Sequence, residues 1–218
     1  MTRKKEVSEK SLELNVCAEM LQSLRSYWRY RKALWIGLTQ REERQQGLDT
    51  RVHNVDALAL MLQFKSPWAT YYDEDFYKFS INKRQHEALE QLRSPEAVFY
   101  AFPLYNRWWK ADSHAPDLLQ DTWLLPAVCI PSGALVREST PIAVTRRGRS
   151  QVKVLSVAPP YWEATCEAVN AKRYLERDLR ETLDGPRFMR IAMLKEWIAL
   201  SRMAVLRFRN LGIFYIPL

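Results

Sequence analysis

The chain has 218 residues, which suits one α/β domain with a sizeable core. Apolar residues make up 47% of the chain and only 6 residues are Gly, so a disordered tail, a linker and a fibrous protein are excluded. Lys and Arg number 33 against 25 Asp and Glu, which gives a formal net charge of +8. This balance favours a polyanionic partner such as nucleic acid, with a merely basic soluble protein as the alternative.

The three cysteines, Cys17, Cys129 and Cys166, lie far apart in the sequence and have no paired metal-ligand spacing. The sequence therefore predicts neither a disulfide framework nor a zinc cluster, as is typical of a cytoplasmic protein. The first ten residues are polar and charged, and no stretch approaches the ~18 apolar residues of a membrane span. We expect a cytoplasmic protein that does not interact with a membrane.

Hydrophobic periodicity predicts an alternation of helices and strands in the first half of the chain. Residues 8–31 carry apolar side chains at steps of three and four, as an amphipathic helix does. A continuously apolar run such as 97–103 is typical of a central strand. This alternation indicates a mixed α/β fold. After the first helix, the expected elements are strands at 32–38, 49–55, 58–65 and 76–81, a helix at 83–93 and a strand at 97–103.

The second half of the chain is expected to begin with strands and to end in helices. The predicted strands are 123–131, 141–145 and 152–157, with a basic turn between the last two. Beyond Pro159 and Pro160 the pattern predicts a C-terminal helical hairpin, helical over 161–183 and 188–209, and then a short apolar tail, 211–218. We expect one compact domain with a core at 1–158, which includes the basic β-hairpin, and a C-terminal helical extension packed on it at 159–218.

Three polar residues on the predicted hairpin of 49–55 and 58–65 point to chemistry. Antiparallel pairing about Val55 and Asp56 sets Asp49 near Gln63, and period-two alternation sends Gln63 and Lys65 to the same face. A carboxylate and an amide oxygen suit Mg²⁺, and an ammonium beside them can orient a water or stabilise negative charge at phosphorus. The arrangement therefore favours metal-assisted phosphodiester hydrolysis.

These residues resemble the PD-(D/E)xK, or restriction-endonuclease-like, nucleases, in the variant whose second motif is QxK, as in some type IV restriction enzymes. The resemblance covers residues 8–103, about half the chain, and runs through Glu13, Asp49, Gln63, Lys65 and Gln85. It implies a restriction-endonuclease-like core sheet flanked by helices. It also implies that Asp49, Gln63 and Glu13 bind Mg²⁺ or Mn²⁺, that Lys65 assists the attacking water, and that Gln85 belongs to the same catalytic site.

One departure from the commoner family motif and several plainer explanations bear on this assignment. Gln63 stands where the commoner motif has an acid, which removes one negative charge and predicts weaker metal binding or lost catalysis. Lys65 can instead be a strand-end lysine that reaches solvent. Glu13 can be a solvated acid that complements the helix dipole, and Gln85 and His86 can be surface residues of a charged helix.

A cluster of basic residues surrounds the predicted turn between the strands 141–145 and 152–157. A basic hairpin turn can enter a groove of nucleic acid or lie along its backbone. A solvated charged face is the ordinary alternative. The residues expected to bind nucleic acid are Arg146, Arg147, Arg149 and Lys153.

The expected function is that of a metal-dependent endonuclease acting on double-stranded DNA, in bacterial defence against foreign DNA, where the resembling family is common. A second copy of the chain or a partner protein of the defence system is a further expected partner. The alternative is a catalytically inactive nuclease-fold module that binds nucleic acid or scaffolds a complex, which the neutral Gln63 favours. A small-molecule enzyme has little support, because the sequence has no Gly-rich phosphate loop and no Ser or Cys nucleophile motif.

Overall fold

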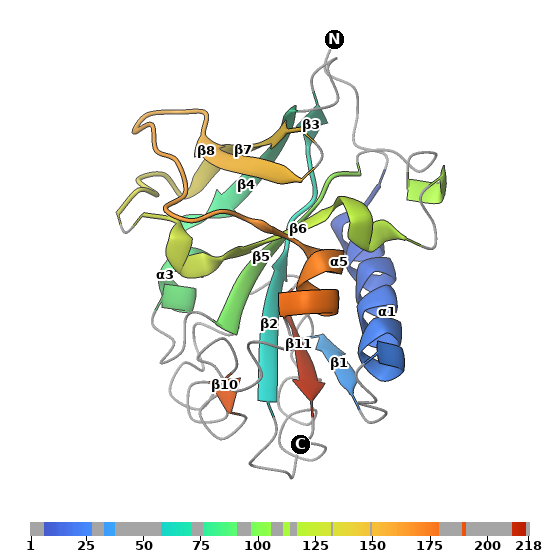
Figure 1. The fold of residues 1–218 in the computed structure, drawn as a ribbon. Helices are drawn as coiled ribbons and strands as arrows, with labels where there is room; N and C mark the ends of the chain where they lie inside the picture. Colours follow the sequence, from blue (N-terminus) through green and yellow to red (C-terminus); the bar gives the residue numbers. More distant parts are fainter. Residues whose placement is uncertain are drawn as a thin grey trace.

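The computed structural model describes eleven stretches of the chain, and they form a mixed α/β fold of two β-sheets and several helices. Figure 1 shows the larger sheet at the centre, the smaller sheet above it and the long helix α1 along one side. The described residues are 7–27, 33–37, 58–70, 76–90, 97–105, 111–113, 117–131, 133–148, 150–178, 189–190 and 211–216.

The larger sheet has seven strands in the described part of the chain, in the order β1-β11-β2-β5-β6-β9, with β10 paired to β2. The central pair, β2 and β5, is parallel, and the other pairings are antiparallel. The strands are β1 (Leu34–Gly37), β2 (Leu58–Phe64), β5 (Val98–Pro103), β6 (Thr122–Pro126), β9 (Val169–Asn170), β10 (Met189–Arg190) and β11 (Leu211–Ile216).

The smaller sheet is antiparallel throughout, in the order β3-β4-β7-β8. The two strands β7 and β8 form the hairpin expected at 141–157, and Gly148 adopts a φ of 70° in its turn, which glycine tolerates without strain. The strands are β3 (Ala69–Thr70), β4 (Phe76–Asn82), β7 (Ser139–Arg147) and β8 (Gln151–Ser156).

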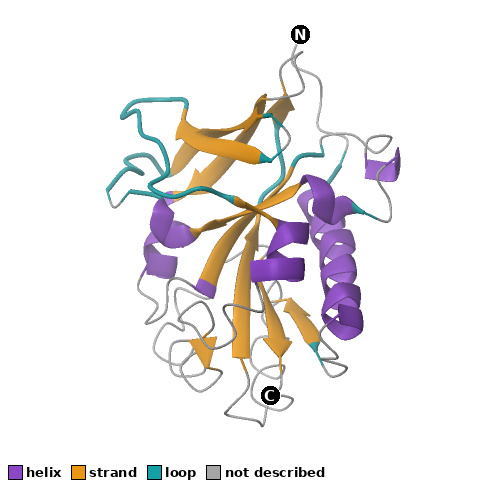
Figure 2. Ribbon diagram, in the orientation of Figure 1, coloured by secondary structure: helices purple, strands orange, loops and turns teal. Residues whose placement is uncertain are grey.

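The helices flank the sheets, as Figure 2 shows. Helix α1 confirms the expectation of a helix near 8–31, and α3 confirms the one expected at 83–93 over its described part. The helical elements are α1 (Glu9–Tyr27), α3 (Lys83–Glu90), the 3₁₀ turns η2 (Leu118–Asp121) and η3 (Ala127–Cys129), α5 (Ala171–Arg173) and the π turn η4 (Tyr174–Asp178).

The larger sheet separates two hydrophobic cores, and alternation along β2 assigns its side chains to them. Ala59 and Met61 belong to the core shared with the smaller sheet and α3. Leu60, Leu62 and Phe64 belong to the core shared with α1, α5 and η4. Since successive side chains of a strand point to opposite faces, odd-numbered β2 residues face the smaller sheet and even-numbered ones face α1.

Helix α1 buries one stripe of apolar side chains against the larger sheet. Leu12, Val16, Met20 and Leu24, four residues apart, are each at most 2% exposed. Their spacing places them on one face of the helix. Ser8 precedes the helix and accepts a hydrogen bond from the Ser11 backbone N–H at 3.0 Å, which is an N-cap.

The C-terminal part of the chain differs from the expectation of a helical hairpin. The helix expected from Tyr161 begins only at Ala171, because Val169–Asn170 pairs with β6 and Asn170 then caps α5. The expected apolar tail is instead β11, an interior strand between β1 and β2, with Ile213 and Phe214 fully buried. Residues 179–188 and 191–210, on which most of the expected hairpin falls, lie outside the described residues.

The predicted pairing of Leu58–Lys65 with the segment just before it is wrong for β2. One edge of β2 is occupied by β11, from Leu211↔Gln63 to Ile216↔Leu58. The other edge is occupied by β10 and β5. A strand has only two hydrogen-bonding edges, so the antiparallel neighbour of β2 comes from the far end of the chain. Residues 49–55 themselves, and Asp49 with them, lie outside the described residues.

The expectation of no disulfide is also wrong, because Cys129 and Cys166 are bonded, with their Cα atoms 5.5 Å apart. The backbone N–H of Thr165 donates to the Cys129 carbonyl at 2.8 Å, so the two segments are aligned independently of the sulfurs. The bond ties η3 to the segment that leads into β9. Sequence spacing gave no signal for this pair, because 37 residues separate the two cysteines. The third cysteine, Cys17, is free and buried.

Loss of this bond should weaken the fold. A Cys129→Ser, Cys166→Ser double variant should lose about 2–4 kcal/mol of unfolding free energy, because the bond restricts the unfolded chain over a 37-residue loop. Chemical denaturation with and without dithiothreitol measures the loss. The reductant should destabilise the wild type to the same extent and leave the double variant unchanged. A wild type insensitive to the reductant would contradict the pairing.

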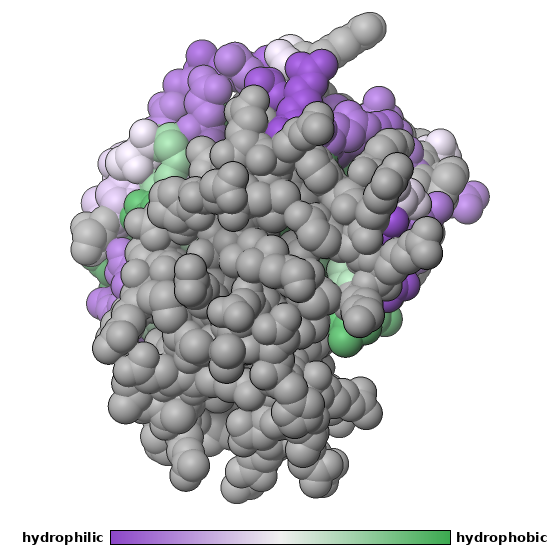
Figure 3. All heavy atoms as spheres, turned by 60° about the horizontal axis from the view of Figure 1, so that its bottom comes forward, coloured by the Kyte–Doolittle hydropathy of each residue, from purple (hydrophilic) through white to green (hydrophobic). Residues whose placement is uncertain are grey.

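In the view of Figure 3, most of the visible described residues are hydrophilic, and the hydrophobic ones form a few small patches. No helix within the described ranges is long and apolar enough to cross a membrane. Within the described ranges, the large apolar side chains that are exposed are Leu14, Leu34, Trp68, Val128, Val136 and Tyr161.

Candidate functional site

The candidate site lies where the parallel strands β2 and β5 end. Gln63 is fully buried near the end of β2 and is paired in register with Tyr100 of β5. Lys65 follows the strand, and its backbone N–H donates to the Ala101 carbonyl at 3.0 Å. The alternation along β2 directs Gln63 to the face that packs against α3 and the smaller sheet, and Lys65 contacts groups on that same face. The carboxyl edge of parallel strands is where α/β proteins commonly bind ligands.

Lys65 is a buried lysine with a defined partner. Its side chain is 9% exposed, and its Nζ donates to Gln85 Oε1 at 3.2 Å. The same Nζ lies 6.0 Å from the centroid of the Tyr100 ring. Burial lowers the pKa of the Lys65 ammonium, and the Glu9 carboxylate partly offsets this shift. The alternative of a strand-end lysine that reaches solvent does not describe this side chain.

Gln85 is brought to Lys65 by the first turn of α3. The Asn82 side chain accepts a hydrogen bond from the Gln85 backbone N–H at 3.0 Å, which caps the helix where β4 ends. Gln85 and His86 are 9% and 3% exposed, so the alternative that they are surface residues is wrong.

His86 contributes to the site as an uncharged hydrogen-bonding group. Its Nδ1 is 3.1 Å from the hydroxyl of Tyr100, and its Nε2 is 3.5 Å from Glu90 Oε1. Burial lowers the pKa of His86 to about 4, so the imidazole is neutral at pH 7. Burial also raises the pKa of the Tyr100 hydroxyl, which keeps that group protonated. The pair is therefore an uncharged hydrogen-bonded support beneath the Lys65 ammonium.

The structure does not bring Glu13 into this group. Glu13 is fully buried, and its Oε1 accepts a hydrogen bond from Lys10 Nζ at 2.9 Å. Trp35 packs edge-on against Phe64, at 6.0 Å between ring centroids, on the α1 face of the sheet. Burial raises the pKa of the Glu13 carboxyl. The alternative of a solvated acid is wrong as well, because the group has no exposed surface.

Glu9 is the acid that sequence reasoning missed. It lies in the first turn of α1 and is the carboxylate whose charge acts on Lys65. The signal that could have found it is its position one helical turn before Glu13, on the same face of α1.

The described residues offer only part of a metal site. They contain no group of three His, Cys, Asp or Glu side chains that could hold an ion. The amide oxygen of Gln63 is a hard ligand of the kind that Mg²⁺ accepts. Asp49, the carboxylate expected beside it, lies outside the described residues. Among the described residues, Gln63 thus offers one such oxygen, and Glu13 is paired through its Oε1 with Lys10.

Two of the four residues expected to bind nucleic acid are engaged in ion pairs. Arg146 Nη2 lies 2.6 Å from Asp121 Oδ1, and Lys153 Nζ lies 2.5 Å from Glu163 Oε1. Arg147 is exposed at the end of β7, and Arg149 lies outside the described residues. The basic turn therefore projects from a hairpin whose stem already neutralises part of its charge.

Because Arg147 is exposed whereas Arg146 is in an ion pair, their substitutions should affect DNA binding and stability differently. Arg147→Ala should flatten the slope of log affinity for DNA against log salt by about one unit, as expected for one lost phosphate contact. Arg146→Ala should instead lower the unfolding temperature, because it removes an ion pair to Asp121, a residue that is 8% exposed. Arg173→Ala, an exposed arginine on α5, is the charge-matched control. An unchanged slope for Arg147→Ala would show that DNA docks elsewhere.

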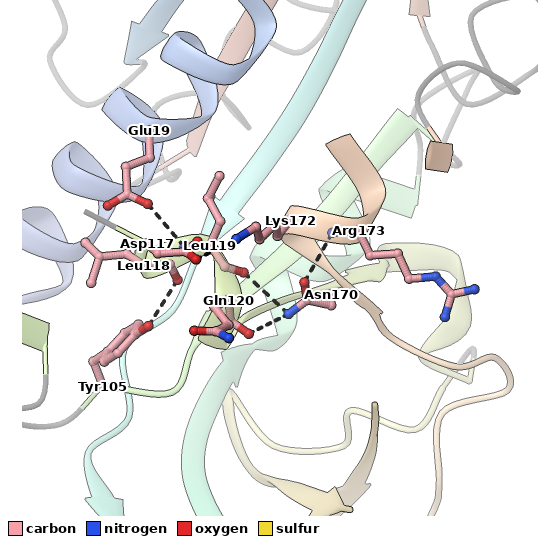
Figure 4. A network of polar contacts seen from close by, with 9 residues as sticks. All are labelled: Glu19, Tyr105, Asp117, Leu118, Leu119, Gln120, Asn170, Lys172 and Arg173. Carbon is pink, nitrogen blue, oxygen red and sulfur yellow. Dashed lines mark hydrogen bonds and ion pairs between the residues drawn. The ribbon is translucent and has the colours of Figure 1, made fainter. Parts of the chain in front are cut away.

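A second polar feature lies on the other side of the larger sheet, between α1, η2 and α5 (Figure 4). Lys172 Nζ pairs with Asp117 Oδ2 at 2.6 Å, and Glu19 Oε2 accepts from the Leu119 backbone N–H at 3.3 Å. Asn170 Nδ2 donates to the Gln120 carbonyl at 2.7 Å. These contacts border a groove of about 280 Å³ in which acidic side chains outnumber Lys172. Such a groove repels phosphate, and its bonds serve to fix η2 between the helices.

Comparison of the chain with protein-family models, with curated proteins and with solved structures gave no match. The class of this protein is therefore defined by its fold and its candidate site alone. It is a mixed α/β protein with a buried lysine, hydrogen-bonded to a glutamine, at the carboxyl edge of a parallel strand pair.

Proposed function

We propose that this protein is a metal-dependent nuclease of the PD-(D/E)xK type that hydrolyses phosphodiester bonds in DNA. The observation that carries the proposal is the hydrogen bond of the buried Lys65 to Gln85 at the carboxyl edge of β2 and β5, on the face of the sheet to which strand alternation directs Gln63. The mixed α/β fold with helices beside the sheet is compatible with the proposal, whereas β2 lacks the predicted hairpin partner and β4 belongs to the smaller sheet.

A buried ammonium is costly, which favours a role for Lys65 beyond packing. Burying a lysine ammonium away from water costs roughly several kcal/mol of free energy. The hydrogen bond to Gln85 and the charge of Glu9 offset only part of this cost. Charged groups kept in such positions are frequent at functional sites. In phosphodiester hydrolysis the Lys65 ammonium would hold the attacking water or stabilise the charge that develops on the phosphate oxygens.

The remaining residues would position Lys65 and hold the ion. Gln85 fixes the direction of the Lys65 side chain through its amide oxygen. Asp49 and Gln63 would supply oxygen ligands to Mg²⁺ or Mn²⁺, which when bound polarises the phosphate and lowers the pKa of a bound water. Glu9 would balance the local positive charge.

Double-stranded DNA is the proposed substrate, and defence against foreign DNA the proposed setting, with a second copy of the chain or another defence protein as partner. The net charge of +8 supports a polyanionic substrate. The exposed basic turn at Arg147 offers a contact to its backbone.

A second candidate function is a catalytically inactive module of the same fold that binds nucleic acid or scaffolds a complex. The neutral Gln63 favours it, because an amide brings no charge to a divalent ion. The two functions differ in metal binding, which a single substitution can test.

Gln63→Glu should tighten the binding of Mg²⁺ and Mn²⁺, because it adds the charge that the wild-type site lacks. Isothermal titration calorimetry of both proteins measures the change. Activity can rise or fall, since the new carboxylate also pairs with Lys65 two residues away. The matched control is Gln22→Glu, the same change on α1 beside the acidic groove. If neither wild type nor Gln63→Glu takes up metal, and DNA binding ignores EDTA, the inactive module replaces the nuclease.

A further inference from the structure

Trp68 is an exposed aromatic side chain within three residues of Lys65. It is 45% exposed, whereas the intervening Ser66 and Pro67 are buried. Three residues span at most about 11 Å, so the Trp68 backbone lies within that distance of the Lys65 backbone. This short segment crosses from β2 in the larger sheet to β3 at the edge of the smaller one.

The backbone of Trp68 is fixed, so its ring is not on a loose loop. Its N–H donates to the Lys78 carbonyl at 2.9 Å, and the next two residues pair with β4 as Ala69↔Lys78 and Thr70↔Tyr77. The ring is therefore held in place at the edge of the sheet, and a ligand that covers it would remove apolar surface from water.

A lysine ammonium accompanies the ring. Lys78 Nζ lies 5.5 Å from the centroid of the Trp68 ring, within cation–π distance. Since the ammonium lies over one face of the ring, a base would stack on the rest of the ring, which belongs to a residue that is 45% exposed, and Lys78 would neutralise its phosphate. Bases inside a duplex have both faces covered, so this pair selects single-stranded nucleotides.

We infer that Trp68 and Lys78 form a stacking platform for an unpaired base next to the phosphate that Lys65 contacts. The inference rests on the proposed nuclease function and narrows its substrate to DNA with a single-stranded segment at the cleavage site, such as a frayed end, a flap or a melted step.

The test measures binding without cleavage. Fluorescence anisotropy in EDTA compares a labelled 12-nucleotide single strand with the duplex of the same sequence, for wild type, Trp68→Ala, Trp68→Phe and Tyr161→Ala. Tyr161, 76% exposed, is the control for loss of an exposed aromatic. Trp68→Ala should weaken single-strand binding roughly 5- to 100-fold, Trp68→Phe much less, and duplex binding should not change.

An abasic oligonucleotide separates stacking from other effects. Removing single bases in turn should reproduce the Trp68→Ala loss at one position in the wild type and add nothing further in Trp68→Ala. Equal single-strand affinity of wild type and Trp68→Ala, or equal losses for single strand and duplex, would overturn the platform. Cleavage in Mg²⁺ is measured separately. A Trp68→Ala protein that cleaves DNA and binds the single strand as tightly as the wild type would contradict the stacking platform alone. A wild type that cleaves no DNA would contradict the proposed nuclease function.

Discussion

Lys65→Met should abolish metal-dependent cleavage while the protein stays folded. The substitution keeps the length of the side chain but removes the ammonium that lies at the carboxyl edge of β2. Loss of one preorganised charge at a developing oxyanion typically costs 10²–10³-fold in rate, so we expect a loss of roughly that size or more. Asp49→Ala should have an effect of the same order, because it removes the expected carboxylate ligand.

The control for this prediction is Lys83→Met, which removes the charge of a lysine that is 40% exposed on α3 and paired with Glu87. It should leave cleavage unchanged. Circular dichroism of Lys65→Met should show an unfolding temperature close to that of the wild type, because the loss of a hydrogen bond to Gln85 is offset by the relief of burying a charge. Cleavage retained by well-folded Lys65→Met would remove Lys65 from the site.

Phe64→Ala should lose about 3–5 kcal/mol of unfolding free energy. Phe64 is fully buried between β2 and α1, where its ring packs edge-on against Trp35. The substitution leaves a cavity beneath the helix and frees the strand that carries Gln63 and Lys65. Denaturant titration followed by circular dichroism measures the loss.

The matched control for Phe64→Ala is Tyr161→Ala, a truncation of an aromatic that is 76% exposed, which should change stability by less than about 0.5 kcal/mol. Equal stability of Phe64→Ala and this control would show that the Phe64 ring is not packed between the larger sheet and α1.

Local periodicity predicted the elements that depend on neighbours in the chain. The apolar stripe of α1 and the continuous apolar run of β5 are visible in sequence because each repeats within a few residues. The position of β11 was not predictable in this way. Its apolar run reads equally well as a tail, and only pairing with β1 and β2, which are more than a hundred residues away, makes it an interior strand.

The residues of the candidate site were likewise predictable only where local sequence patterns determine their positions. Alternation along β2 put Gln63 and Lys65 on one face, and the helix after β4 brought Gln85 to them. Glu13 could not be assigned from sequence, because its side depends on which face of the sheet α1 covers. The ion pairs of Arg146 and Lys153 were equally hidden, since their partners come from other elements of the fold.

The most direct measurement is a cleavage assay on wild type and Lys65→Met with supercoiled plasmid, single-stranded DNA and RNA, each with Mg²⁺, Mn²⁺ or EDTA. The proposed function predicts that the wild type cleaves DNA with either metal, that EDTA stops cleavage, and that Lys65→Met is inactive under all conditions. No cleavage of any substrate by the wild type with either metal, or equal cleavage by the two proteins, would contradict it.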